Sequence, residues 1–454
     1  MRLPRHEVSP YRLYLVLESG MSFLTGITYA TIMVYWVTSG RLNPLQLVLL
    51  GTVLELTYFV LQLPTGIFAD LVSRRLCVLV GLFIVGLSMI MQSLSPAFPN
   101  LLAAQLVLGL GAALNSGAEE AWIADELAGP AEDAAVEADP SEPDGPGSDD
   151  LDPLTPVYLR ATQLGLVGTL TGSLLSGFIA LAGLNKPLLV GGVLICLLAI
   201  GVAFVMPERN FRPAGRAEGA PRRPGVGGIV RMAAALLTEQ TRSARRAIVA
   251  VPGLVLLFGM IAFVGLWSES FDRLWGAFLL RDIRFPKVAG LHPAMWFSLI
   301  ACAVALLALG STEVARRRTA RLGPDSVAGA LLVLIIAIGA AAVVMAMAHA
   351  FAVAVAAYLA VEVLRPVINP LVTGWMVRRI EPSVRATALS AQEMFDSAGQ
   401  IVGGPVIGLI GMLASIRVAL LAGAAAMPPA AAFVAAASRS QRAEPVRPAA
   451  RPAA

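Results

Sequence analysis

The sequence predicts a polytopic helical membrane protein, and three observations support that prediction. Hydrophobic residues make up 57% of the 454 residues and charged residues only 14%, whereas soluble domains contain about 25% charged residues. Apolar stretches of about 20 residues, the length needed to cross a hydrocarbon core, recur between short polar or basic turns. These stretches are continuous and rich in alanine and leucine, as in Val327–Val344, whereas the strands of a membrane β-barrel alternate over about 10 residues.

The apolar stretches predict about twelve transmembrane helices and hence an all-α membrane protein. The first helix is expected to remain in the mature chain, because it is long, contains Glu18 and lacks a short apolar region followed by a small-residue cleavage site. The expected spans are residues 11–38, 44–69, 75–95, 99–127, 154–182, 187–206, 248–280, 290–314, 325–348, 350–377, 384–412 and 415–437.

Two polar interruptions define the domain organisation. Residues 207–247 are a Pro-, Gly- and Arg-rich segment, expected to be a cytoplasmic linker that ends in a short amphipathic stretch on the membrane surface. The linker separates two six-helix bundles, residues 1–206 and 248–438, and a disordered cytoplasmic tail, residues 439–454, follows. The acidic, Pro-rich insertion 128–153 is expected to be disordered. It is either a solvated insertion without a specific role or a segment that regulates the protein or binds a partner.

Basic residues predict the orientation in the membrane. Most of the 34 lysines and arginines fall at the N-terminus, in alternate turns, in the central linker and in the C-terminal tail. The positive-inside rule therefore places both termini in the cytoplasm of a multi-pass protein of the inner or plasma membrane. The net charge of +4 reflects this topology and gives no reason to expect a nucleic-acid partner.

The turn between the second and third spans, GIFADLVSRR, contains one acid and two bases between apolar runs. Its spacing resembles the loop signature GxxxD(R/K)xG(R/K)(R/K) of the major facilitator superfamily, with Leu71 and Ser73 as departures. The matching residues are Gly66, Asp70, Arg74 and Arg75.

This turn is expected to act as a conformational latch. Gly66 is expected to allow the close approach of another helix. Asp70 is expected to pair with an arginine or with a helix N-terminus in one conformational state and to separate in another. The alternative is that Arg74 and Arg75 only anchor the topology.

Other parts of the chain resemble the same family. The second half repeats a basic turn after Gly310, and the first span of each half carries a Glu-Ser pair, at Glu18 and at Glu269. In the fourth span Gln105 stands where the family has an arginine linked to proton coupling. The resemblance covers nearly the whole chain and implies two bundles that rock about a cavity at the bilayer midplane.

The eleventh span contains a run of small residues and a proline. The run GQIVGGPVIG resembles the Gly-Pro signature in the fifth helix of drug antiporters of this family. Small residues permit close helix crossings, and proline permits a bend, so this run either packs helices tightly or forms a hinge. The residues are Gly399, Gly403, Gly404, Pro405 and Gly408.

Ionisable residues within the spans are the main functional candidates, because each is costly in a bilayer unless it faces a partner or water. Glu18 and Glu269 are the preferred cavity acids that bind and release a proton, while acids with a nearby arginine alternatively form structural ion pairs. In the fourth span Glu119, Glu120 and Asp125 are expected to reach water or Arg160. The proton-coupling or cavity candidates are Glu18, Glu55, Glu269, Asp272, Arg273, Glu362 and Arg365.

Aromatic residues are the candidate contacts for an apolar or cationic compound. Tyr29, Phe271 and Trp275 are the substrate-cavity candidates, and the last two lie four residues apart beside Glu269. For aromatic residues near a span end, the alternative is anchoring at the membrane surface.

The sequence leads to a transporter rather than an enzyme. It contains no Walker, HExxH, GxSxG or Cys-x-x-Cys motif, and its three cysteines and three histidines are dispersed, so no catalytic residue, cofactor or metal site is expected. The resemblance implies a secondary transporter, and the leading expectation is proton-coupled efflux of a lipophilic or cationic small molecule. Its partners would be that molecule, protons and the lipid bilayer. A metabolite uptake symporter or facilitator of the same fold is one alternative, and a non-transporting membrane sensor or scaffold is another.

Overall fold

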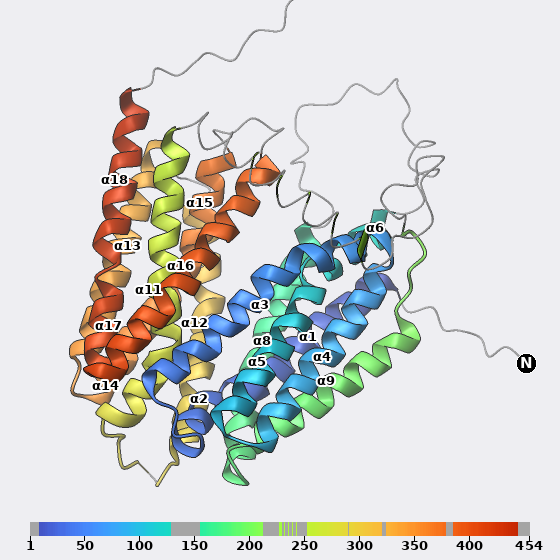
Figure 1. Ribbon diagram of the computed structural model, residues 1–454, viewed down its shortest axis with the longest axis horizontal. Coiled ribbons are helices and arrows are strands. Elements are labelled where there is room, and N and C mark those ends of the chain that lie inside the picture. Colours follow the sequence, from blue (N-terminus) through green and yellow to red (C-terminus); the bar gives the residue numbers. More distant parts are fainter. Residues whose placement is uncertain are drawn as a thin grey trace, which may run out of the picture. The chain divides into compact units, whose positions relative to one another are not determined.

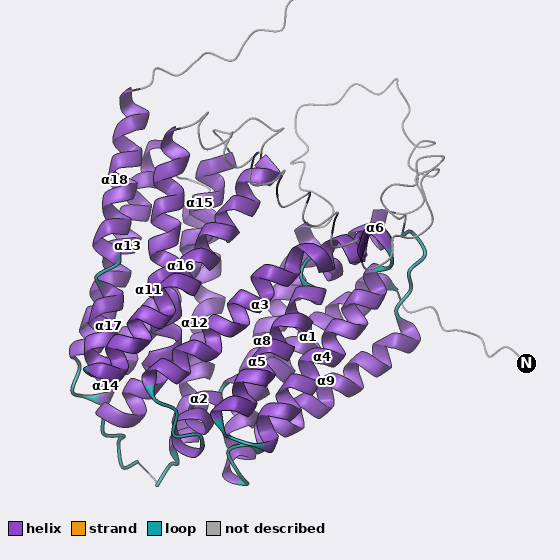
Figure 2. Cartoon of the chain, viewed as in Figure 1, coloured by secondary structure: helices purple, strands orange, loops and turns teal. Residues whose placement is uncertain are grey.

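Helices are the regular structure of the described part of the chain (Figure 2). This computed structural model describes residues 9–128, 155–211, 252–288, 290–319, 324–377 and 385–443, and the single positions 227, 228, 231, 235, 238 and 242. The acidic insertion, most of the central linker with its amphipathic stretch, and the end of the C-terminal tail lie outside the described residues. The chain divides into a first unit, Met1–Leu237 with Arg284–Leu309, and a second unit, Thr238–Ile283 with Gly310–Ala454.

Twelve helical segments within the described residues are long and apolar enough to cross a membrane. Their ends agree with the expected spans to within a few residues, so the prediction of an all-α membrane protein with about twelve spans is confirmed. Large apolar side chains project outward from these helices; Leu94 is 74% exposed and Phe204 is 84% exposed. Such exposure is what helices that face lipid require.

The first six spans all lie in the first unit, and two of them are broken helices (Figure 1). The first span contains α1 (Pro10–Tyr29), α2 (Ile32–Val34) and the π-helix η1 (Tyr35–Ser39). The fourth contains α5 (Phe98–Asn115) and α6 (Ala118–Ala128). The others are α3 (Pro44–Leu71), α4 (Arg74–Leu94), α8 (Thr155–Leu181) and α9 (Lys186–Val205).

The remaining six spans begin with α11 (Figure 1). The tenth span contains α14 (Phe351–Leu364), the 3₁₀ turn η2 (Arg365–Val367) and α15 (Ile368–Val377), and the twelfth contains α17 (Ile416–Ala424) and α18 (Met427–Ala443). The others are α11 (Pro252–Asp282), α12 (Pro293–Thr319), α13 (Pro324–Met347) and α16 (Arg385–Leu413). Residues of α12 up to Leu309 group with the first unit.

Local chemistry explains where several helices start. Asn43 caps α3, because its Oδ1 accepts a hydrogen bond from Gln46 N at 2.9 Å while Gln46 Oε1 accepts one from Asn43 N at 3.0 Å. This reciprocal arrangement satisfies two backbone donors at the helix start. Ser73 caps α4 by accepting from Leu76 N at 2.9 Å. The serine that departs from the family signature therefore defines the N-terminus of α4.

The breaks in the fourth and tenth spans also have sequence causes. Gly117, between α5 and α6, has φ = +70°, a conformation that favours glycine. In the tenth span Pro366 lies in η2 and has no N–H to donate to the carbonyl of Glu362 four residues earlier. Each break places charged side chains, Glu119 in one case and Arg365 in the other, beside an interrupted helix.

Glycines bring the first and fifth helices of each half into close contact. In the first unit, a Cβ added at Gly172 of α8 would overlap the carbonyl oxygen of Phe23 on α1. In the second unit, a Cβ at Gly399 of α16 would overlap the carbonyl oxygen of Ala262 on α11. Gly399 and Gly403 thus pack at a helix crossing, as small residues permit, while Pro405 lies inside the continuous helix α16.

The expected close approach at Gly66 is wrong. Among the described residues, no atom lies within 4 Å of the position that a Cβ would occupy at Gly66. Close crossings in the first unit instead use Gly26 of α1 with Gly172 of α8, and Gly86 of α4 with Gly192 of α9.

Candidate functional site

A cluster of charged side chains in the second unit is the candidate functional site. It begins on α11, where Glu269, Asp272 and Arg273 lie within two helical turns. Glu269 is 3% exposed, and its Oε1 accepts a hydrogen bond from Arg273 Nε at 3.1 Å. The i,i+4 spacing brings these two side chains together on one helix face. The preferred cavity acid of this half is therefore held in an ion pair.

The break in the tenth span supplies the second ion pair. Arg365, the first residue of η2, donates from Nη1 to Asp272 Oδ1 at 2.7 Å. This pair connects α11 to the tenth span and uses a residue from each. This ion pair joins residues 93 positions apart, so it is not one of the neighbouring pairs that the sequence suggests.

Two further carboxyl groups complete the cluster. Glu362 of α14 lies within electrostatic range of Arg365 and Asp272, and among the described residues no ion pair or hydrogen bond involves its carboxyl group. Asp396 of α16 accepts a hydrogen bond from Gln400 Nε2 at 2.8 Å and is also within electrostatic range of Arg365. The cluster thus contains four carboxyl groups and two guanidinium groups, so negative charge is in excess.

An aromatic stack borders this cluster. Trp275 and Tyr358 stack with ring centroids 3.9 Å apart, and the rings of Phe271 and Tyr358 stack at 6.0 Å. Trp267 adds a contact to Phe271 at 5.2 Å. Phe271 is only 1% exposed, so its main role is to support the stack. Tyr358 was not predicted, although it precedes Glu362 by one helical turn.

The other predicted candidates lie in the first unit. Glu18 is partly buried on α1, near Glu120 of α6. Glu55 is partly buried on α3, and Tyr29, the last residue of α1, is 41% exposed. Each lies on a membrane-spanning segment of the first unit.

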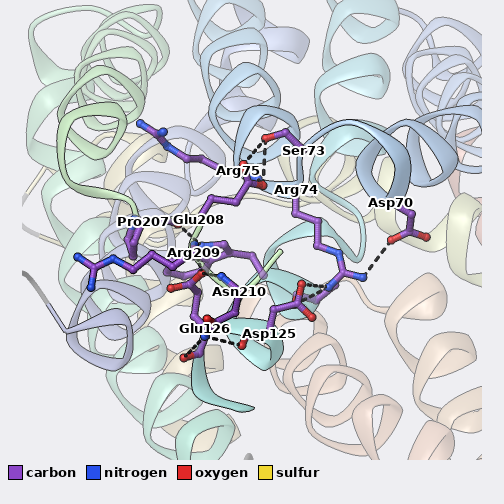
Figure 3. Close-up of polar contacts among 12 residues, drawn as sticks. Asp70, Ser73, Arg74, Arg75, Asp125, Glu126, Pro207, Glu208, Arg209 and Asn210 are labelled. Carbon is purple, nitrogen blue, oxygen red and sulfur yellow. Dashed lines mark hydrogen bonds and ion pairs between the residues drawn. The ribbon is translucent and has the colours of Figure 1, made fainter. Parts of the chain in front are cut away.

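The predicted latch residues form a network at one end of the first unit (Figure 3). Arg74, at the start of α4, lies between two acids: its Nη2 is 3.1 Å from Asp70 Oδ1 and its Nη1 is 2.5 Å from Asp125 Oδ2. Nη1 also donates to the carbonyl of Ala121 at 3.0 Å. Asp125 pairs with Arg74 rather than with Arg160, which donates to Tyr11 Oη at 2.9 Å, and its side chain is still 30% exposed.

The network includes a segment that sequence reasoning missed. Glu208, just after α9, accepts hydrogen bonds from Ser73 Oγ at 2.8 Å and Arg75 N at 3.0 Å (Figure 3). Trp122 Nε1 donates to Pro207 O at 2.7 Å. Glu126 accepts from Arg209 N at 2.7 Å. The start of the central linker is therefore fixed to α4 and α6, and the only sequence signal for this was an acid immediately after the sixth span.

Comparison with solved structures identifies the fold. The chain matches the nucleoside transporter NupG at 14% identity and a TM-score of 0.69, over 94% of this chain and 99% of that one. It matches a POT family transporter solved with 5-aminolevulinic acid at 11% identity and a TM-score of 0.67, over 95% and 96%. A bacterial homologue of the human lysosomal transporter Spinster matches at 18% identity and a TM-score of 0.66, over 97% and 100%.

These likenesses establish the architecture. The chain has the major facilitator superfamily fold. The fold expected from the turn signature and from the two halves is thereby confirmed. No protein-family model matches the sequence, and no curated protein matches it.

In the candidate site of this membrane protein, acidic side chains outnumber basic ones. Carboxyl groups in a membrane-spanning segment require a partner or water, and here two arginines serve four carboxyls. A positive charge from a proton or from a cationic ligand would balance the excess. Of the adjacent rings Phe271 and Tyr358 are buried and Trp275 is partly exposed, so Trp275 is the ring that an apolar or cationic group can contact.

Proposed function

We propose that the protein is a secondary active transporter that works by alternating access and exports a lipophilic or cationic small molecule in exchange for protons. The fold is one that performs alternating access by rocking of its halves. The observation that carries the proposal is the excess of carboxyl groups over arginines on α11, α14 and α16. Both termini are proposed to lie in the cytoplasm, as the distribution of basic residues suggests.

Each part of the cluster has a proposed role. Arg273 and Arg365 hold Glu269 and Asp272 in place, and Glu362 is available for a proton or for the positive charge of the cargo. Trp275, held by its stacking on Tyr358, gives the cargo an apolar surface. The Glu269–Arg273 pair is proposed to open when a proton binds, since a neutral carboxyl loses most of its attraction for a guanidinium.

The network around Arg74 is proposed to stabilise one conformational state. Asp70 is 52% exposed on its side chain, while Arg74 is 20% exposed. An exposed pair of this kind contributes about 1 kcal/mol or less. A latch of that strength favours one state while still allowing rapid exchange, which suits a transporter that must visit both states.

A second candidate is the transport of a polar metabolite by symport or facilitated diffusion. The observation in its favour is that the similar solved structures include proteins named as a nucleoside transporter and as peptide transporters. The same charge cluster would then bind the amino or carboxylate groups of the metabolite.

Transport in proteoliposomes with an imposed proton gradient tests these alternatives. The probes are the cationic dye ethidium, a nucleoside and a dipeptide. The proposal expects ethidium to move against the direction of proton flow and expects Glu362→Gln to reduce that movement. Movement of the nucleoside or dipeptide in the direction of proton flow, without movement of ethidium, would replace efflux by metabolite symport. If no probe moved while a protein partner bound residues 128–153, a sensor role would be favoured.

A further inference from the structure

The break in the fourth span creates a second acidic cluster, in the first unit. Because α5 ends at Asn115 and α6 begins at Ala118, Glu119 and Glu120 occupy the first turn of a new helix. The unpaired N–H groups and the dipole of a helix N-terminus favour negative charge at this position. The glycine turn therefore allows carboxylates to stand about nine residues inside the end of a membrane span.

The packing of α6 brings these acids near α1. Trp122 and Ile123 of α6 belong to the same buried core as Leu13 and Leu17 of α1. Glu119 consequently lies within electrostatic range of Glu18 and Glu120, and Tyr14 lies within range of all three carboxyl groups. Residues from two helices thus form one cluster rather than three separate acids.

Two arginines near this end of the first unit have other partners. Arg74 is paired with Asp125 and Asp70, and Arg160 donates to Tyr11. Within the described residues, the ion pairs do not include Glu18, Glu119 or Glu120. This cluster differs from the one in the second unit because, in the part of the chain that the structure describes, no arginine forms an ion pair with its acids.

Glu119 is the feature that points to a ligand. Its Oε1 is shielded from solvent and has no hydrogen-bond donor among the described residues. A buried acceptor without a donor costs about 1–3 kcal/mol, and more when it is charged. An N–H group of a bound cation would remove that cost.

Aromatic rings beside the acids define the chemistry of this ligand. The rings of Tyr14 and Tyr158 meet edge to face, with centroids 6.0 Å apart and planes at 78°. A tyrosine ring attracts an organic cation through its face. A charged amine that also carries an apolar group would satisfy both the carboxyl groups and the rings.

We propose that Glu18, Glu119 and Glu120, together with Tyr14 and Tyr158, bind the protonated amino group of an organic amine. Glu119 accepts the hydrogen bond of the ammonium group, and Glu18 and Glu120 contribute negative charge. The assignment of this amine as the cargo rests on the proposed transport function. Binding itself can be measured without transport.

Calorimetric titration of the full-length protein in lipid nanodiscs tests the site. The probe is 2-phenylethylamine, which is charged at neutral pH, and the comparison ligand is 2-phenylethanol, which is neutral and of similar size. The amine is expected to bind more tightly than the alcohol. Glu119→Gln is expected to weaken amine binding about tenfold or more, because a charge-assisted hydrogen bond is lost. Glu120→Gln is expected to have a smaller effect, since Glu120 is exposed.

A matched control makes the result specific. Glu393→Gln makes the same chemical change at an exposed acid of α16 in the second unit, and amine affinity is expected to stay unchanged. The midpoint of thermal unfolding shows whether each variant is folded. If Glu119→Gln does not fold, Glu18→Gln is expected to show the same selective loss of amine binding.

Two outcomes would overturn the site. One is that the wild type binds the amine no better than the alcohol, and the other is that Glu119→Gln binds the amine as tightly as Glu393→Gln does. Either result leaves the proposed transport function intact if ethidium still moves in proteoliposomes. Conversely, amine binding that depends on Glu119 in a protein that moves no probe would support the site and contradict the transport proposal.

Discussion

The first helices of the two units carry the same Glu-Ser pair but surround its acid differently. In α11 the residue four positions after Glu269 is Arg273, and the two side chains form an ion pair. In α1 the residue four positions after Glu18 is Ser22, and the neighbours of Glu18 are the acids of α6. A single side chain at i+4 thus decides whether the carboxyl group is neutralised within its own helix. The two units share a framework but differ in their charge balance.

Replacing a glycine at a helix crossing with a larger residue should destabilise both units to the same extent. Gly172→Leu in α8 and Gly399→Leu in α16 each place a side chain against the backbone of the first helix. Overpacking of this kind costs about 3 kcal/mol. The yield of folded protein and the thermal unfolding midpoint in detergent are therefore expected to fall for both variants.

The matched controls are Gly201→Leu in α9 and Gly329→Leu in α13, where a Cβ would meet no atom within 4 Å among the described residues. Both should unfold near the wild-type midpoint. If Gly399→Leu were as stable as Gly329→Leu, the close crossing of α11 and α16 would not be essential.

Removing an arginine from the charge cluster of the second unit should lower the free energy of unfolding, because it breaks an ion pair. Arg365→Gln leaves the carboxylate of Asp272 without its partner, at a cost of about 2 kcal/mol for a partly buried pair. Denaturant unfolding should show this loss. Adding Asp272→Asn to the same chain should recover most of it, since the uncompensated charge is then removed. A double variant as unstable as the single one would contradict the pairing.

The two first-helix acids should respond differently to neutralisation. Glu18→Gln and Glu269→Gln are each expected to slow proton-coupled transport about tenfold, equivalent to about 1.4 kcal/mol. Only Glu269→Gln should also lower the unfolding midpoint, because it leaves Arg273 without the carboxylate that it pairs with. Normal pH-dependent transport in both variants would contradict their coupling role. An equal loss of stability would contradict the difference between the units.

The smallest effect is expected at the latch. Asp70→Asn removes an ion pair whose acid is half exposed, so stability should change by less than about 1 kcal/mol. Turnover in proteoliposomes should slow about threefold, while the dissociation constant of the substrate should stay near the wild-type value. Asp125→Asn offers a comparison, because Asp125 is the more buried partner of Arg74. An unchanged turnover rate in both variants would leave Arg74 as a topological anchor only.

The transmembrane spans could be predicted from the sequence, because a span depends mainly on the length of an apolar stretch. Charge within such a stretch is conspicuous, so the sequence also singled out Glu269, Asp272, Arg273, Glu362 and Arg365, and their role in transport stays a prediction. The way these residues pair could not be read from the chain. The Asp272–Arg365 pair joins residues 93 positions apart, and such contacts depend on how the helices pack.

The surroundings of Tyr358 and Glu119 also depend on features that the apolar pattern of the sequence does not show. Tyr358 resembles any other aromatic residue of an apolar helix until its stacking with Trp275 is known. The interpretation of Glu119 as a solvent-reaching acid did not use Gly117, whose positive φ starts a new helix just before it. A glycine two positions before an acidic pair is a usable sequence signal of this break.

The contacts at the start of the central linker also reduce the length of chain that is free to extend. Residues 207–210 are held by hydrogen bonds to α4 and α6, and the ring of Phe211 lies 5.9 Å below the guanidinium of Arg74. Each extended residue spans at most about 3.5 Å, so these contacts hold about 17 Å of chain that would otherwise be free after α9. Glu208 therefore helps to set the point at which the chain leaves the first unit.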